Sequence, residues 1–322
     1  MSQTSLEGTI KEQLKDRSNA HFLLVDGMSK LTTHKVNKCQ SSIFHVSGFQ
    51  WKLIIHPAGD DGRQDYLSFY VKIKDRESLP FNWEVHCSLK LSIVSQNKSI
   101  KLPWIKMCYN EDKIMNGEER FMSHKVLQEI TQGFNTNDKV VFCAEITNVK
   151  PSFNVNVPRQ TMATAEHLKL TELPQNKSRV TWKITQFSSF DGDHHSSHEF
   201  TVGPRKWKIM MYPKGIYEEE EQLSFYLNAS HFVTKGPKEK TLAVYKLRVL
   251  DQDPRQRNHY EHKYSRWFHY GPDRLSDDIS IFEQEHLDVP LNKLKEPSWG
   301  FMVRDQIYLG VEFLLVSTTE DL

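Results

Sequence analysis

One long motif occurs twice in this 322-residue chain, and its matched residues all lie 156 positions apart. The first copy runs from Phe44 to Tyr70 and the second from Phe200 to Tyr226. Shared positions include Phe44 and Phe200, Val46 and Val202, Trp51 and Trp207, Pro57 and Pro213, Gly59 and Gly215, and the run Leu-Ser-Phe-Tyr that ends each copy. Solenoid repeats recur every ~20–50 residues, whereas this period has the size of a whole domain. The chain is therefore predicted to contain two related domains that arose by duplication.

A second block of matches helps to place the domain boundaries. This block pairs Gly133 with Gly300, Phe134 with Phe301, Asp138 with Asp305 and Glu145 with Glu312. These pairs lie 167 positions apart instead of 156, so the second copy has gained eleven residues between the two blocks. We expect an N-terminal tail over residues 1–20, a first domain over 21–149, a linker over 150–177 and a second domain over 178–322. The tail is compatible with either a short helix through Ile10 and Leu14 or disorder. The linker is polar and contains three prolines, and its residues 161–173 are compatible with one or two helical turns.

Apolar and polar residues alternate within each copy, as they do in a half-buried β-strand. Leu223, Phe225 and Leu227 fall on one face, whereas Ser224 and Tyr226 fall on the other. The same alternation occurs in runs that begin at Trp51, Leu67, Val85, Phe142 and Trp207. Clusters of Gly, Pro, Asn and Asp separate these runs, and helices long enough for parallel crossovers are missing between them. The pattern predicts an all-β chain made of antiparallel sandwiches.

Charge and composition limit the classes of partner. Lys plus Arg number 42 and Asp plus Glu 41, which gives a net charge of +1. Proteins that bind nucleic acid usually carry a basic excess, because neutralising phosphates supplies much of their affinity. No apolar run has the length of a membrane span or the pattern of a signal peptide. We therefore expect no nucleic acid and no membrane as partner, a cytoplasmic or nuclear location, and reduced cysteines.

Four segments of the second copy carry a recognisable combination of residues. They are Phe-x-Val-Gly-x3-Trp-x4-Tyr-Pro-x-Gly at 200–215, Leu-Ser-Phe-Tyr-Leu at 223–227, Lys-Leu-Arg-Val-Leu-Asp-Gln at 246–252 and Gly-Phe-x-Val-x-Asp at 300–305. This combination resembles the MATH (TRAF-C-like) family, and the tandem arrangement is most similar to the plant TRAF-like proteins. The first copy resembles the family less closely, since Asp26 and Leu31 stand where the second copy has Trp182 and Phe187.

The resemblance implies two antiparallel eight-stranded β-sandwiches in tandem, whose exposed faces bind short segments of other proteins. Family members usually carry an effector as well, such as a BTB domain, a RING, a coiled coil or a ubiquitin-specific protease, and none is visible in this sequence. We therefore predict a non-enzymatic, monomeric adaptor that is connected with ubiquitin-linked pathways. The alternative is a β-sandwich that binds a small molecule or a glycan.

Tyr70 and its counterpart Tyr226 are the first candidates for peptide contacts. In the family, the tyrosine of this Leu-Ser-x-Tyr segment lies on the binding face, and the alternation independently places both tyrosines opposite the core-facing residues. An exposed tyrosine offers apolar area and a hydroxyl at a low entropic cost. The alternative for both is an ordinary surface or interdomain tyrosine.

Three further aromatic residues match the groove of the family by position. They are Tyr245, Trp267 and Phe268. Tyr245 alternates in phase with Leu247 and Val249, which favours a place in the core. Trp267 and Phe268 are adjacent, so they cannot both face inward on a strand, and their alternative role is to anchor a loop.

Both copies depart from the family at a Trp-Gly-Phe segment whose aromatic residues line the peptide pocket. The corresponding residues are Asn116, Gly117 and Glu118 in the first copy and residues 277–279 in the second. This departure favours a different ligand or a degenerate site.

Metal binding and catalysis find little support in the sequence. Histidines gather at His194, His195 and His198, with His259 and His262 further on, but no Cys or acidic ligand has suitable spacing. Cys87 and Cys143 lie within predicted strands without a neighbouring motif histidine. Phosphate loops, G-x-S-x-G and HExxH are missing as well. We expect no metal, no cofactor and no enzymatic activity; a hydrolase with an unrecognised site is the remaining alternative.

Overall fold

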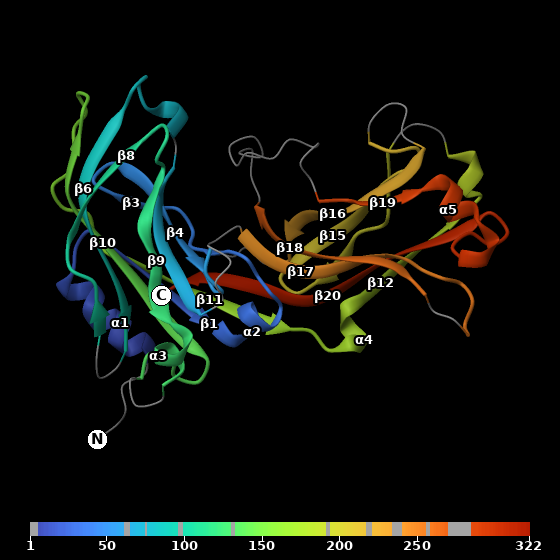
Figure 1. Ribbon diagram of the computed structural model, residues 1–322, viewed down its shortest axis with the longest axis horizontal. Coiled ribbons are helices and arrows are strands. Elements are labelled where there is room, and N and C mark those ends of the chain that lie inside the picture. Colours follow the sequence, from blue (N-terminus) through green and yellow to red (C-terminus); the bar gives the residue numbers. More distant parts are fainter. Residues whose placement is uncertain are drawn as a thin grey trace. The chain divides into compact units, whose positions relative to one another are not determined.

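The computed structural model describes residues 6–60, 65–74, 76–95, 99–129, 133–190, 194–216, 221–233, 240–255, 258–269 and 285–322. The chain divides into two compact units, Met1–Leu170 with Thr319–Leu322 and Thr171–Thr318 (Figure 1). Both units consist of β-strands with a few short helices, so the all-β prediction is confirmed for both copies. Among the described residues, no helix is long and apolar enough to cross a membrane.

The larger sheet of the first unit has the strand order β11-β1-β10-β6, and β7 and β8 both pair with β6. Its strands are β1 (Ala20–Asp26), β6 (Glu84–Val94), β7 (Ser99–Lys101), β8 (Ile105–Asn110), β10 (Lys139–Pro151) and β11 (Thr164–Glu172). The first six residues of β1 are all buried. Both faces of this strand are covered, one by the sandwich core and the other by a helix, which explains why its sequence is apolar without alternation.

The smaller sheet of the first unit has the order β2-β4-β5-β9, with β3 paired to β4. Its strands are β2 (Cys39–Gln40), β3 (Phe44–Val46), β4 (Phe49–His56), β5 (Tyr66–Ile73) and β9 (Met115–Ser123). Aromatic contacts join the inner faces of the two sheets: the rings of Phe69 and Phe142 are 5.3 Å apart, and those of Trp51 and Tyr109 are 5.1 Å apart. Each such buried side chain stabilises the fold by ~1.5–3 kcal/mol.

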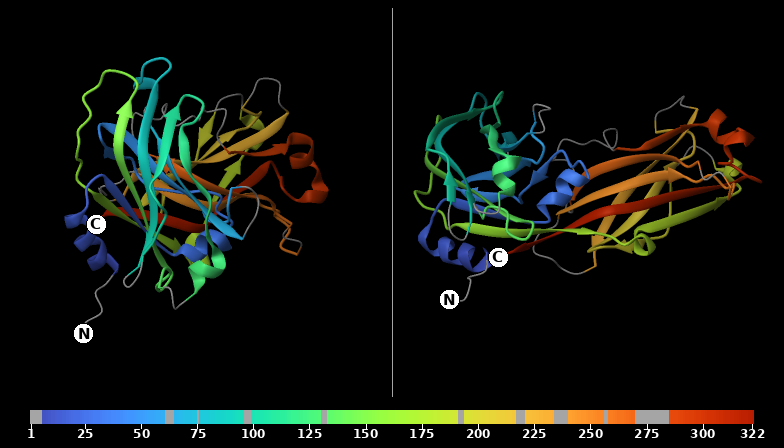
Figure 2. Two further views of the ribbon diagram at one scale, coloured as in Figure 1. Left: turned by 60° about the vertical axis from the view of Figure 1, so that its left-hand side comes forward. Right: turned by 60° about the horizontal axis from the view of Figure 1, so that its bottom comes forward.

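Three short helices accompany this sandwich. They are α1 (Leu6–Asp16), α2 (Met28–Thr33) and α3 (His124–Gln128), with a 3-10 turn at Arg76–Ser78. α1 lies along the outer side of the larger sheet, where Leu6 and Ile10 pack against Phe22, Leu24 and Cys143 (Figure 2). Of the two expectations for the N-terminal tail, a helix or disorder, the structure has the helix for residues 6–16.

The segment around residues 161–173 corrects one expectation from the sequence. Instead of helical turns, Thr164–Glu172 forms the strand β11, which pairs in parallel with β1 from His21 opposite Thr164 to Asp26 opposite Lys169. The reason is that β1 is buried and needs a hydrogen-bonding partner along its second edge. Leu322 also belongs to this unit: its backbone N donates to the carbonyl O of Ala165 at 3.1 Å.

The second unit repeats the sandwich. In its larger sheet β17 (Lys240–Val249) lies between β18 (Tyr260–His269) and β20 (Gln306–Asp321), and β12 (Arg179–Thr185) pairs with β20. The smaller sheet contains β13 (His195–Ser196), β14 (Phe200–Val202), β15 (Arg205–Tyr212), β16 (Gln222–Phe232) and β19 (Leu287–Pro290). Short helices occur at α4 (Gln175–Ser178) and α5 (Leu291–Lys295), with 3-10 turns at Phe187–Ser189 and Pro297–Trp299.

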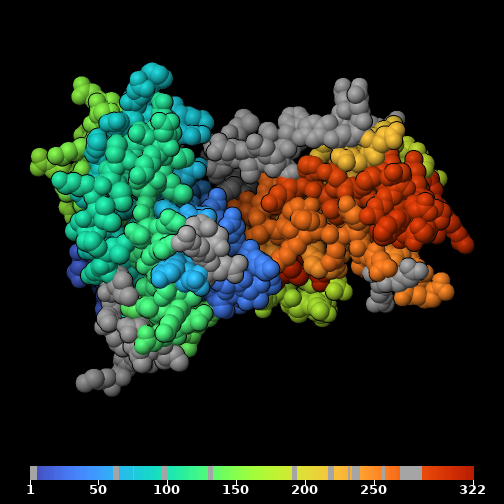
Figure 3. Space-filling view, viewed as in Figure 1, coloured from blue at the N-terminus to red at the C-terminus, as the bar shows by residue number. Residues whose placement is uncertain are grey.

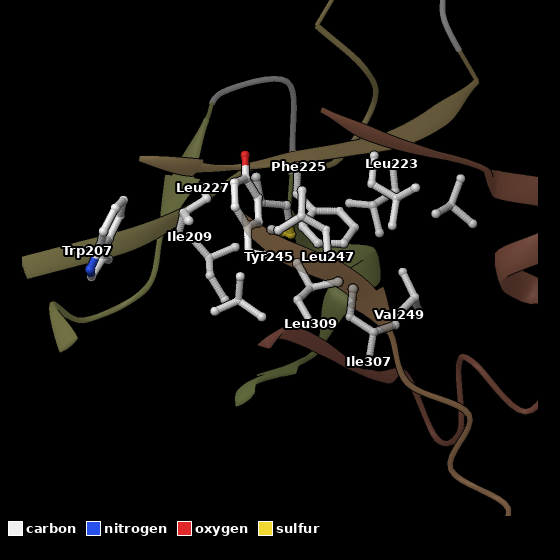
Figure 4. Close-up of a cluster of buried hydrophobic side chains, with 14 of the residues drawn as sticks. Trp207, Ile209, Leu223, Phe225, Leu227, Tyr245, Leu247, Val249, Ile307 and Leu309 are labelled. Atoms are coloured by element: carbon white, nitrogen blue, oxygen red, sulfur yellow. The ribbon is translucent and has the colours of Figure 1, made fainter. Parts of the chain in front are cut away.

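The core of the second unit lies between these two sheets (Figure 4). Alternate residues of β15 and β16 point inward to meet β17 and β20; the side chains include Trp207, Ile209, Leu223, Phe225, Leu227, Tyr245, Leu247, Val249, Ile307 and Leu309. The period-two pattern therefore predicts correctly which residues of β15 and β16 point into this core, although Ser224 and Tyr226 on the opposite face of β16 are buried as well.

Candidate functional site

The smaller sheet of each unit has an outer face that points away from its core. In the first unit, β4 and β5 place His56, Ser68 and Tyr70 there, and we call these three residues with Asp60 the first outer face. The rings of His56 and Tyr70 meet edge to face with centroids 6.0 Å apart. The Ser68 hydroxyl lies 2.5 Å from the carbonyl O of Glu119 and 3.3 Å from the Asp60 carboxylate. Tyr70 is half-buried, so part of this face is open to solvent.

The electrostatics of the first outer face follow from burial and from Asp60. Burial, and then a hydrogen bond to the Asp60 carboxylate, raise the pKa of Tyr70 far above its ordinary value. Burial lowers the pKa of His56, although the neighbouring Asp60 acts in the opposite direction. At neutral pH the face therefore presents a protonated tyrosine and a neutral imidazole beside Asp60.

Tyr70 lies directly against the backbone of the neighbouring strand. It is opposite Gly117 of β9, and a Cβ atom at position 117 would come within 2.6 Å of the Tyr70 Cα and 2.8 Å of its Cδ1. Position 117 corresponds to the glycine of the family's Trp-Gly-Phe segment, which is Asn116-Gly117-Glu118 in this copy. Of its neighbours, Asn116 is buried and donates to the Cys108 carbonyl at 3.0 Å, and Glu118 is half-buried. The glycine therefore keeps a role beside Tyr70 even without the flanking aromatic residues.

The equivalent face of the second unit is formed by Tyr212, Ser224, Tyr226 and Asp288, which we call the second outer face. The Tyr212 and Tyr226 rings stack with centroids 6.3 Å apart. The Ser224 hydroxyl donates to Asp288 at 2.5 Å, and the other oxygen of this carboxylate is 3.1 Å from His286 Nε2. Tyr226 itself is only 5% exposed, which corrects the expectation of an exposed tyrosine. Alternation gives the direction of a side chain but not what covers it.

The two outer faces share one plan. Ser68 and Ser224, Tyr70 and Tyr226, and His56 and Tyr212 are each 156 positions apart. In both units a serine hydroxyl contacts a carboxylate, and the tyrosine ring contacts a second ring from the preceding strand. Sequence reasoning missed these second rings and both carboxylates. The sequence could have indicated the rings, because His56 and Tyr212 occupy equivalent positions of the repeat. Asp60 and Asp288 are not equivalent positions, so the repeat could not have indicated the carboxylates.

Two of the remaining predicted contacts lie in the core. Tyr245 is fully buried, with Phe268 at 6.0 Å and Phe313 at 6.2 Å between ring centroids, and Phe268 is 7% exposed and packs on Trp207 at 4.9 Å. These positions correct the prediction that Tyr245 and Phe268 form a binding surface; the alternation of Tyr245 with Leu247 had indicated the core. Trp267 is half-buried, and its ring is 5.2 Å from the Lys240 ammonium. Residues 277–279 lie outside the described residues.

The histidines and buried cysteines singled out in the sequence do not form a reactive centre in the described part of the chain. Around His194, His195, His198, His259 and His262, the described residues bring no three potential metal ligands together. Burial raises the pKa of both Cys87 and Cys143 to about 12, which disfavours the thiolate that a nucleophile requires.

The paired sandwiches and their matched outer faces define a tandem protein of the TRAF-like class. Residues 20–146 and 179–313 both match the family model of the MATH domain, and the chain belongs to this family. MATH domains generally mediate protein–protein interactions.

Two curated relatives from Arabidopsis thaliana illustrate the family. Ubiquitin C-terminal hydrolase 13 is 30% identical over 117 residues, which cover 36% of this chain and 10% of that protein. A MATH domain and coiled-coil domain-containing protein is 31% identical over 139 residues, which cover 43% of this chain and 47% of that protein. The chain thus spans less than half of either relative, and the hydrolase shares only its MATH region. The solved structure of Notothenia coriiceps TRAF5 aligns with 45% of this chain and 82% of its own, at 16% identity and a TM-score of 0.32.

Proposed function

We propose that the chain is a non-enzymatic interaction protein whose first outer face binds a short segment of a partner protein. The observation that carries this proposal is the half-buried Tyr70 beside His56, Gly117 and Asp60. The second unit repeats this arrangement at Tyr226. A fixed aromatic pair offers contact area without loss of side-chain freedom, and the adjacent carboxylate accepts hydrogen bonds. The Trp267 side chain is a second, peripheral candidate contact in the other unit.

The proposed ligand is an extended peptide. One of its apolar side chains lies on the rings of Tyr70 and His56, and a donor group of the peptide faces Asp60. We place the protein in the cytoplasm and expect it to act as a monomer. We also propose that it joins partners in ubiquitin-linked pathways, since one of its MATH-domain relatives carries the name of a ubiquitin hydrolase.

The test is a selection of peptides from a random displayed library on the purified full chain, followed by calorimetry with the selected peptides. We expect Tyr70→Ala to weaken binding at least tenfold, which corresponds to about 1.4 kcal/mol. Tyr308→Ala is the matched control, because Tyr308 lies in β20 of the larger sheet of the second unit, beside Lys183, and belongs to neither outer face. Equal affinity of the wild type and Tyr70→Ala would contradict the proposal. Binding of glycans in place of peptides, lost in Tyr70→Ala, would assign this face to the alternative ligand class.

A further inference from the structure

A group of three chemically different side chains gathers on the larger sheet of the first unit. Glu84 and His86 are two residues apart on β6, so they point to the same side of the sheet. Cys108 on β8 stands directly opposite His86 in the strand register. One ligand atom from each of the three lies within 4.8 Å of the others. The side chains between them on these strands, Val85 and Tyr109, are fully buried, so the group is on the outer side.

Two of the three separations are close to those between the ligands of a tetrahedral metal ion. Glu84 Oε2 lies 3.2 Å from His86 Nε2, and His86 Nε2 lies 3.9 Å from Cys108 Sγ. Zinc bonds of about 2.0–2.1 Å to nitrogen or oxygen and about 2.3 Å to sulfur place tetrahedral ligands roughly 3.3–3.6 Å apart. The third separation, between Glu84 and Cys108, is at most 4.8 Å, and the side chains of His86 and Glu84 are 56% and 48% exposed, so both have room to turn toward a shared ion.

The supporting backbone is fixed on both sides. β6 pairs with β8 through Glu84 to Leu89 and with β10 on its other edge. Ser152 anchors the start of β6, since its hydroxyl accepts from Glu84 N at 3.0 Å and its own backbone N donates to the Glu84 carbonyl at 2.8 Å. Ligands on paired strands keep their spacing better than ligands on loops. The segment that contains β6 and β8 forms part of the outer surface of this unit (teal in Figure 3).

The chemistry of this group favours a cation over a nucleophile. A carboxylate, an imidazole and a thiol from Glu84, His86 and Cys108 lie together, and all three are zinc ligands. A divalent cation binds the thiol as a thiolate, so its binding releases the thiol proton. Thiolate and imidazole ligands select zinc over magnesium and calcium, which prefer oxygen.

We propose that Glu84, His86 and Cys108 form a zinc-binding site on the first unit, with a fourth position open to water or to a ligand from a partner. The site lies on the larger sheet and is independent of the first outer face on the smaller sheet. The sequence prediction of no metal rested on clustered histidines, whereas these ligands are joined only by the register of two strands.

Thiol chemistry gives a readout that reports on this site alone. Cys39, Cys87 and Cys143 are buried, and Cys108 is the partly exposed cysteine of the chain. The folded chain is first reduced and freed of metal with a chelator. The rate at which a thiol reagent then modifies it reports on Cys108. We expect Zn²⁺ to slow this modification at least tenfold in the wild type, and His86→Ala and Glu84→Gln to remove most of the protection.

A second measurement uses Co²⁺ as a spectroscopic substitute for zinc. We expect a thiolate-to-cobalt charge-transfer band in the wild type and its loss in Cys108→Ser. His45→Ala is the matched control, because His45 is an exposed histidine on β3 of the same unit. Protection by Zn²⁺ that is equal in the wild type, His86→Ala and Glu84→Gln would overturn the assignment, as would the absence of both protection and a cobalt band in the wild type.

Discussion

At the scale of single residues, the contact between Tyr70 and Gly117 determines the shape of the first outer face. The absence of a side chain at position 117 lets the Tyr70 ring lie on the backbone of β9. A Cβ atom there would also come within 2.2 Å of the Phe69 carbonyl O, so the two strands would have to separate locally. Packing of this kind tolerates no added methyl group without movement of backbone or ring.

We therefore predict that Gly117→Ala destabilises the folded chain by about 1–3 kcal/mol and also weakens peptide binding by displacing Tyr70. Urea denaturation measures the first effect and calorimetry the second. Arg120→Ala on the same strand is the control, since Arg120 is exposed and a surface substitution changes stability by about 0.5 kcal/mol or less. Unchanged stability of Gly117→Ala would show that β9 and Tyr70 do not pack as described.

At the scale of elements, the strands of both smaller sheets could be predicted from alternation, because one face is buried and the other is polar. Strand β11 could not be predicted in this way. Its partner β1 is distant in sequence, and Glu166 and His167 interrupt the apolar residues of β11 although both are buried. The candidate site was predictable only in part: the direction of Tyr70 follows from the period of β5, whereas Asp60 and Gly117 are brought to it by turn geometry and by strand pairing.

Helix α1 is another element that depends on tertiary contacts. An isolated helix of eleven residues is marginal in water, so its apolar side chains must supply the stability by packing on the sheet. Ile10 is fully buried in the cluster with Phe22 and Cys143.

We predict that Ile10→Ala lowers the free energy of unfolding by about 2–5 kcal/mol, through lost burial and a residual cavity. Lys11→Ala on the exposed side of α1 should leave it nearly unchanged. Denaturant titration of the full chain compares the two variants. Similar effects of both substitutions would mean that α1 does not dock through Ile10.

At the scale of the whole molecule, the two copies share the arrangement of their outer faces but differ in how far the tyrosine of each face is exposed to solvent. Tyr70 is half-buried on its face, whereas Tyr226 is 5% exposed and stacked on Tyr212. A ligand that needs the aromatic ring can reach the first copy without rearrangement, whereas in the second it must first displace what covers the tyrosine.

We predict that the first copy supplies most of the binding energy. Tyr70→Ala should reduce the affinity for a selected peptide at least tenfold, and Tyr226→Ala should reduce it less than threefold while lowering stability through lost packing. Calorimetry on the two single variants and on the double variant separates these contributions. A larger loss of affinity in Tyr226→Ala would assign recognition to the second copy.

The assignment of Thr319–Leu322 to the first unit affects how this chain is completed during synthesis. The ribosome produces the first repeat early, yet the residues that close its β11 edge follow only after the whole second repeat. Leu322 also packs against the cluster that holds α1. The first unit therefore reaches its final packing only after the second repeat has been synthesised, although domains generally fold in N-terminal-first order. A fragment that stops near residue 170 lacks a native part of this unit, so it is an incomplete substitute for the first repeat.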